Sequence, residues 1–143
     1  MNVPRARFAL VAALFATLAL GCGDSRPQII PVRGTATRGG KPVANLYLDF
    51  QPTSGRNSWA FTDDQGHYEL EYDQGVMGAI VGEHTVTVSL KPKDLEAELA
   101  LQTGQFKWSA DAQKIGAKYG AGSPNRKKVT VAPGSEVIDL ELD

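Results

Sequence analysis

Cysteine and histidine are nearly absent from this chain of 143 residues, which contains one cysteine and two histidines. One cysteine cannot form an intrachain disulfide, so a folded domain must rely on its apolar core for stability. His67 and His84 are not part of a His-Glu-x-x-His motif, and Asp63, Asp64 and Asp73 lack the spacing of a calcium-binding loop. The sequence therefore predicts no metal and no cofactor, with structural histidines and turn-forming aspartates instead.

A surplus of positive charge is also missing. The chain has 15 basic and 16 acidic residues, and removal of residues 1–21 would take away two arginines and leave a formal charge of −3. Domains that bind nucleic acid commonly carry a basic patch and a high isoelectric point. We therefore expect no nucleic acid partner and no basic membrane-binding surface.

The longest apolar run covers 8–20, carries no charged residue and follows Arg5 and Arg7. It is too short to span a bilayer as a helix and has the length of the hydrophobic region of a secretory signal peptide. The run ends in Leu-Ala-Leu-Gly before Cys22, a pattern that resembles the lipobox of bacterial lipoproteins. The resemblance implies cleavage after residue 21 and acylation of Cys22 by fatty acids such as palmitate. The alternative is an ordinary signal peptide that ends beside a lone cysteine.

The next segment, 22–31, is rich in polar residues and proline and is predicted to be a short tether. Two or three acyl chains would hold a protein firmly at a membrane, because each buried methylene contributes about 0.8 kcal/mol. We therefore expect an exported protein that is lipid-anchored at the outer membrane or the cell surface. Its domain, 32–143, would lie close to the bilayer.

From residue 32 onward, turn residues separate short segments in which apolar and polar residues alternate. This pattern is typical of an all-β fold and not of βαβ units. We predict a seven-stranded antiparallel β-sandwich. Its strands are expected at 32–38, 43–51, 58–62, 67–72, 83–90, 127–132 and 136–142. Two hairpins are expected, one across the Asp-Asp-Gln-Gly turn at 63–66 and one across Pro-Gly-Ser at 133–135.

The segment 91–125 lacks sustained alternation and is predicted to be a helical or irregular insertion. Leu95 and Leu99 lie four residues apart among good helix formers, which predicts a short helix near 94–101. An extended excursion through Phe106, Trp108 and Tyr119 is expected to follow. Aromatic side chains in loops commonly anchor partners, so these three are the candidate partner-binding residues. Alternatively, they cover an open end of the sandwich.

Several segments carry a family likeness. Val-Arg-Gly-Thr-Ala at 32–36, Gly-Lys-Pro-Val-Ala at 40–44 and Thr-Asp-Asp-Gln-Gly-His-Tyr at 62–68 resemble, in this order, the carboxypeptidase regulatory-like domain. That domain is a transthyretin-like (prealbumin-type), Ig-like sandwich related to Cna B-type domains. The continuation at 78–86 and the Pro-Gly turn at 133–134 are similar to small bacterial lipoproteins with one such domain. The resemblance implies the fold and a surface location, and most family members have no known activity.

Two kinds of chemistry known in related folds are not predicted here. The isopeptide bond of some Cna B-type domains needs an asparagine that 136–142 lacks, and the Tyr-Arg-Gly-Ser tail of transthyretin-like hydroxyisourate hydrolases is replaced by Glu-Leu-Asp. We therefore expect a non-catalytic, lipid-anchored envelope module with a binding or structural role toward a protein or glycan partner. The alternative is an envelope hydrolase with an unidentified substrate, in which His67 or His84 would share a pocket with a carboxylate and a serine.

Overall fold

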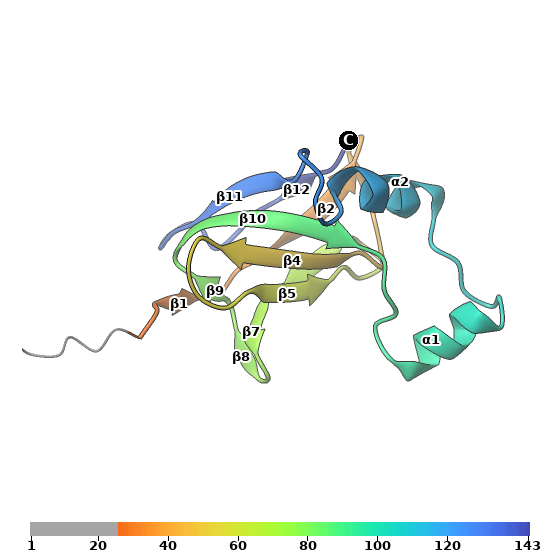
Figure 1. The fold of residues 1–143 in the computed structure, drawn as a ribbon, viewed down its shortest axis with the longest axis horizontal. Helices are drawn as coiled ribbons and strands as arrows, with labels where there is room; N and C mark the ends of the chain where they lie inside the picture. The colour runs from red at the N-terminus through yellow and green to blue at the C-terminus, as the bar shows by residue number, and fades with distance from the viewer. Residues whose placement is uncertain (1–25) are drawn as a thin grey trace, which may run out of the picture.

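The computed structural model describes residues 26–143, which form a β-rich domain with two short helices (Figure 1). Cys22 and the predicted signal peptide lie outside these residues. Within 26–143, neither helix has the length and hydropathy that a membrane span requires. The sheets are mostly antiparallel, as the sequence predicted.

The larger sheet has six strands in the order β11-β10-β4-β5-β7-β8, all paired antiparallel. Period-two alternation gives the sheet a buried and an outer face. In β4, for example, Leu48 and Phe50 are fully buried, whereas Tyr47 and Asp49 lie half-buried on the other face. The strands are β4 (Tyr47–Pro52), β5 (Ser58–Phe61), β7 (Glu71–Asp73), β8 (Val76–Met77), β10 (Gly82–Ser89) and β11 (Lys127–Val131).

The smaller sheet is centred on β2 (Arg33–Arg38). β3 (Lys41–Pro42) and β6 (His67–Glu69) pair with β2 antiparallel, and β12 (Leu140–Glu141) pairs with it parallel. A two-stranded sheet of β1 (Ile29–Ile30) and β9 (Ala79–Ile80) lies at one end of the domain (Figure 1).

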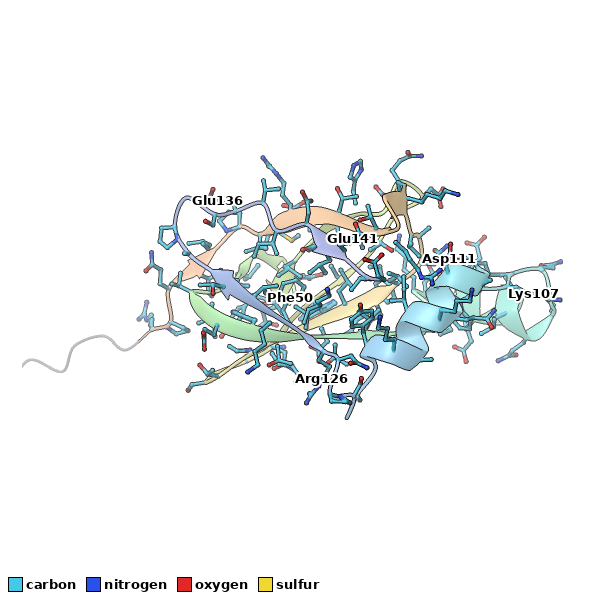
Figure 2. The ribbon with its side chains drawn as sticks, turned by 90° about the horizontal axis from the view of Figure 1, so that it is seen from above. Phe50, Lys107, Asp111, Arg126, Glu136 and Glu141 are labelled. Atoms are coloured by element: carbon cyan, nitrogen blue, oxygen red, sulfur yellow. The ribbon has the colours of Figure 1, made fainter. Side chains whose placement is uncertain are left out.

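The two main sheets share one apolar core, an arrangement consistent with the predicted all-β sandwich. Phe50 lies near its centre (Figure 2), with its ring centroid 5.9 Å from that of Tyr68 in the smaller sheet. Full burial of an apolar side chain of this size contributes about 1.5–3 kcal/mol. The other large, fully buried apolar side chains are Leu46, Leu48, Leu70, Ile115, Leu142, Val32, Val86, Val88 and Val131.

The predicted turn at 63–66 forms, but the strands on either side of it do not pair with each other. The Oδ1 atom of Asp63 accepts hydrogen bonds from the backbone N–H groups of Gln65 (2.9 Å) and His67 (2.8 Å). β5 then belongs to the larger sheet, while β6 pairs with β2. The predicted hairpin is therefore wrong, because the turn carries the chain from one sheet to the other so that Tyr68 enters the core.

The predicted hairpin at the carboxyl-terminal end is wrong for a similar reason. β11 pairs only with β10 among the strands of residues 26–143, and after the turn at 133–135 the chain crosses to the smaller sheet. There the backbone N–H of Ile138 donates to the carbonyl of Arg33, and that of Leu142 donates to the carbonyl of Thr37. Burial of Leu140 and Leu142 against β2 outweighs the local closure of a hairpin.

The amino-terminal boundary of the domain also differs from the prediction. Ile29 and Ile30 were assigned to the tether, yet they form β1 and pair with Ile80 and Ala79. The β-segments of residues 26–143 divide into twelve short strands, since bends interrupt several predicted ones. The predicted strand at 67–72, for instance, splits at Leu70 into β6 and β7, which lie in different sheets.

The insertion contains two helices. α1 (Leu95–Gln102) confirms the predicted short helix, whereas α2 (Ala110–Tyr119) replaces the predicted extended excursion. α2 packs on β10 through Ala112, Ile115 and Tyr119, a spacing of three and four residues that lies on one helix face. The sequence analysis did not predict α2, because the residues between Ala112, Ile115 and Tyr119 are mostly polar or small and obscure the helical periodicity.

Candidate functional site

A cleft of about 630 Å³ lies between the outer face of the larger sheet and the insertion. Clefts of this size are within the range that holds small ligands or short segments of chain. We call it the β5–α1 cleft after the two elements that face each other across it. Its lining comprises Asn45, Trp59, Ala60, Phe61, Thr62, Asp63, Asp64, Glu69, Glu71, Lys91, Pro92, Lys93, Asp94, Glu96, Ala97, Ala100, Phe106 and Trp108.

The sheet side of the cleft follows from the alternation of β5. Ser58 and Ala60 point into the core and are buried, so Trp59 and Phe61 lie half-buried on the outer face. Phe61 packs against Tyr47 of the adjacent β4, with the ring centroids 5.1 Å apart. The cleft therefore has an aromatic floor formed by strand residues, whose backbone is paired within the larger sheet.

The opposite side of the cleft is α1, which stands away from the body of the domain (Figure 1). None of its residues is buried, and Leu95 and Leu99 are 70% and 51% exposed. A helix of eight residues is marginal without packing. Its first turn is held by Asp94, whose carboxylate accepts a hydrogen bond from the N–H of Ala97 (2.8 Å), a cap that contributes about 1 kcal/mol.

The return loop after α1 brings two of the predicted partner-binding residues into the cleft. Gly104 adopts φ +74 and reverses the chain, and the N–H of Phe106 then donates to the carbonyl of Ala100 (2.9 Å). The ring of Phe106 meets that of Trp108 edge to face, with centroids 5.6 Å apart. Trp108 also packs against the core just before Ser109, which caps α2.

Tyr119, the third candidate, does not reach the cleft. It is 4% exposed on the core-facing side of α2, and its hydroxyl donates to the carbonyl of Asp143 (2.9 Å). The alternative interpretation, that this aromatic residue covers the core, therefore describes Tyr119. Phe106 and Trp108 are joined in the cleft instead by Trp59 and Phe61, which were not among the candidates.

Acidic side chains dominate the polar part of the lining. Six carboxylates and two lysines give the cleft a formal surplus of four negative charges. Asp64, Glu69 and Glu96 are exposed, and within residues 26–143 their side chains have no hydrogen-bond or ion-pair partner. Lys91 is engaged differently, because its ammonium nitrogen lies 3.2 Å from the centre of the Tyr47 ring and 5.9 Å from that of Phe61.

Neither histidine lines the cleft. His84 is 2% exposed in β10, and its Nε2 lies 2.7 Å from the carbonyl oxygen of Ile80. Because a carbonyl only accepts, Nε2 carries the proton. His67 is exposed in the other sheet, with Nδ1 3.7 Å from Asp63. Among residues 26–143 no three metal-ligating side chains gather into a candidate metal site.

No family model, no curated protein and no solved structure matches this chain. The likeness to the carboxypeptidase regulatory-like domain therefore stays a prediction that depends on the residues carrying it. The features of the domain that bear on function are those of the cleft: its aromatic floor, its acidic lining and the unpacked helix beside it.

Proposed function

We propose that this chain is a non-catalytic binding module, lipid-anchored at Cys22 to the cell envelope, that holds a protein segment or a glycan in the β5–α1 cleft. The observation that carries the proposal is the convergence of four aromatic side chains on one cleft, from two distant parts of the sequence. Trp59 and Phe61 come from β5, and Phe106 and Trp108 come from the insertion. Aromatic side chains supply much of the binding energy in protein interfaces and also stack on sugar rings.

The position of the cleft suits an anchored protein. β1 lies at one end of the domain and α1 at the opposite end (Figure 1). In the second view, Lys107, which follows α1, is likewise far from Glu136 at the other end (Figure 2). The proposed anchor precedes β1 in sequence. The cleft would therefore open at the end of the domain that faces away from the membrane, where a partner has access.

The fold proposal is the transthyretin-like, seven-stranded sandwich of carboxypeptidase regulatory-like domains. Two features support it. The predicted turn at 63–66 forms and connects the two main sheets. In addition, each of the seven predicted strand regions contains at least one strand, namely β2, β4, β5, β6 with β7, β10, β11 and β12.

The hydrolase alternative requires a pocket in which a histidine, a carboxylate and a serine meet. The lining of the β5–α1 cleft includes carboxylates but neither histidine nor serine. His84 is committed to the Ile80 carbonyl in the core, and His67 contacts Asp63 at 3.7 Å but does not line the cleft. The arrangement of these residues favours binding over hydrolysis.

Tryptophan fluorescence gives a direct test, because both tryptophans of the chain line the cleft. The full chain, purified from membranes in a neutral polyoxyethylene detergent, would be titrated with a pentalysine peptide and with a neutral N-acetylglucosamine hexasaccharide. We expect a saturable change in emission with at least one probe. The affinity for that probe should fall about tenfold in Phe106→Ala. It should stay unchanged in Val137→Ala, because Val137 is an exposed apolar residue outside the cleft. Absence of a saturable change with both probes would overturn the proposal.

A further inference from the structure

We infer that the occupant of the β5–α1 cleft is a cationic peptide segment that carries lysine or arginine side chains. This inference depends on the proposed binding function and adds the chemistry of the ligand. Its basis is the charge of the cleft, in which six carboxylates face two lysines. Opposite charge across an interface speeds encounter and selects partners, whereas like charge costs several kcal/mol. An anionic partner would therefore be rejected.

The carboxylates stand on both sides of the cleft. Glu69 ends β6 and Glu71 begins β7, whereas Asp94 and Glu96 lie at the start of α1. A cation between them would meet acidic groups from two directions. Glu69 and Glu96 are free to turn toward it, because neither side chain has a partner within the described part of the chain.

The aromatic floor is suited to the same ligand. Aromatic rings attract cations through their negative faces, with a contribution of about 0.5–1 kcal/mol at exposed sites. The domain already makes such a contact beside the cleft, since the Lys91 ammonium nitrogen lies 3.2 Å from the centre of the Tyr47 ring. Trp59 and Trp108 line the cleft without such a cation within residues 26–143. The rings would take the alkyl stems and charged groups of lysine or arginine.

The state of α1 favours a peptide over a small cation. The helix has no buried residue, and its Ala97 and Ala100 line the cleft beside Glu96. A peptide segment has backbone and apolar groups that bury surface on such a helix as well as charges that satisfy Glu96. A glycan would also stack on the rings, but a neutral sugar leaves the surplus of carboxylates without a counter-charge.

The test compares pentalysine with pentaglutamate and with the neutral hexasaccharide, on the full chain in detergent, by tryptophan emission. We expect saturable binding of pentalysine only, weakened about tenfold or more when salt rises from about 0.05 to about 0.5 M. Glu69→Gln and Glu96→Gln should each weaken pentalysine binding about threefold, the factor that corresponds to the middle of the range for exposed ion pairs. Glu83→Gln, an exposed acid outside the cleft, should leave binding unchanged.

The outcomes separate this inference from the proposed function. Saturable binding of the hexasaccharide alone would overturn the cationic ligand and keep a cleft that binds glycan. Pentalysine binding that Glu83→Gln weakens as much as Glu69→Gln would also overturn it, because the attraction would then come from the net charge of the surface. No saturable signal with any probe would overturn both proposals.

Discussion

The Lys91 ammonium nitrogen lies 3.2 Å from the centre of the Tyr47 ring, beside the β5–α1 cleft. The two residues belong to different parts of the chain, since Tyr47 begins β4 and Lys91 follows β10 at the start of the insertion. The contact places one positive charge in an acidic cleft, against the ring that packs on Phe61 of the cleft floor. Lys91 is thus an internal occupant that competes with a cationic ligand.

Replacement of Lys91 by methionine should therefore strengthen the binding of pentalysine. The variant has a side chain of similar length and removes the positive charge that now competes with a cationic ligand. We expect an affinity increase of about threefold, which is the size of one exposed cation–π contact. The free energy of unfolding should fall by less than about 1 kcal/mol. Fluorescence titration measures the first effect and urea unfolding the second.

Lys128→Met is the matched control, because Lys128 is exposed on β11 and does not line the cleft. It removes the same charge at a distance. Equal strengthening in both variants would mean that net charge, and not the ring face beside the cleft, governs the affinity.

Alanine substitutions of Phe106 and Trp108 should both weaken ligand binding but differ in their effect on the free energy of unfolding. Phe106→Ala removes a side chain that contacts Trp108 at the cleft, and we expect weaker ligand binding with a cost of less than about 1 kcal/mol in stability. Trp108 also packs against the core, so Trp108→Ala should weaken binding and cost about 2–4 kcal/mol. Both should keep the far-ultraviolet circular dichroism of the folded domain.

Tyr119→Phe is the contrasting variant. It removes the hydroxyl that donates to the Asp143 carbonyl, so it should cost about 1 kcal/mol and leave ligand binding as it is. A loss of binding in Tyr119→Phe without a loss of stability would return Tyr119 to the candidate site and contradict its assignment to the core.

Tyr68 should make stability depend on alkaline pH. Burial raises the pKa of its hydroxyl above the ordinary value of 10.0, and the negative charge of Asp139 raises it further. The hydroxyl donates to the Ile138 carbonyl. Because the folded-state pKa is raised, the stabilisation is fully present below pH 10 and is lost as the pH rises toward the folded-state pKa.

Urea unfolding between about pH 8 and about pH 12 measures this dependence. Tyr68→Phe should be less stable than the parent by about 1 kcal/mol at neutral pH, and its stability should fall less steeply above pH 10. Tyr72→Phe controls for the loss of one phenol. Parallel curves for Tyr68→Phe and the parent would contradict this assignment.

Cys22→Ser tests the anchor. If Cys22 is acylated, the mature parent should begin at this residue, carry the mass of its acyl chains and partition into detergent. The serine variant should lose the lipid and the partitioning. Intact mass and phase separation measure both properties. An unlipidated, freely soluble parent would contradict the anchor and leave the cleft proposals standing.

Much of the layered fold follows from local patterns. Alternation placed Leu48 and Phe50 of β4 inside and located the strands, and the aspartate–glycine chemistry at 63–66 predicted a turn that forms. Strand pairing does not follow from such patterns. β6 joins β2 and not β5 because of the buried contact between Tyr68 and Phe50, which is distant in sequence.

Local sequence patterns also do not predict which backbone segments come into close contact. Gly34 sits where an added Cβ would lie 1.9 Å from the carbonyl oxygen of Ile138, and so it allows the carboxyl-terminal segment to cross β2. The sequence contains this glycine within a strand pattern, but only the structure assigns its neighbour. The parallel pairing of β12 with β2 depends on the same approach.

The candidate site was predicted in part. Phe106 and Trp108 stood out as aromatics in a segment without alternation, and they do line the cleft. The sequence also contained a signal for Trp59 and Phe61, because alternation places these two large aromatic residues on the same face of their strand. They lie on the outer face if Ala60 points into the core. Which face is outer depends on the register of β5 against β4, which no local pattern specifies.

The most direct measurement of the central claim uses the two indole N–H signals of the chain in a ¹H–¹⁵N correlation spectrum. Trp59 of β5 and Trp108 of the insertion both line the cleft, so a ligand bound there should perturb both signals. With the full chain in detergent and added pentalysine, both signals should shift saturably with one common dissociation constant, and both shifts should weaken in Glu96→Gln. Signals that do not move, or that move without saturation, would contradict a cationic ligand in the β5–α1 cleft.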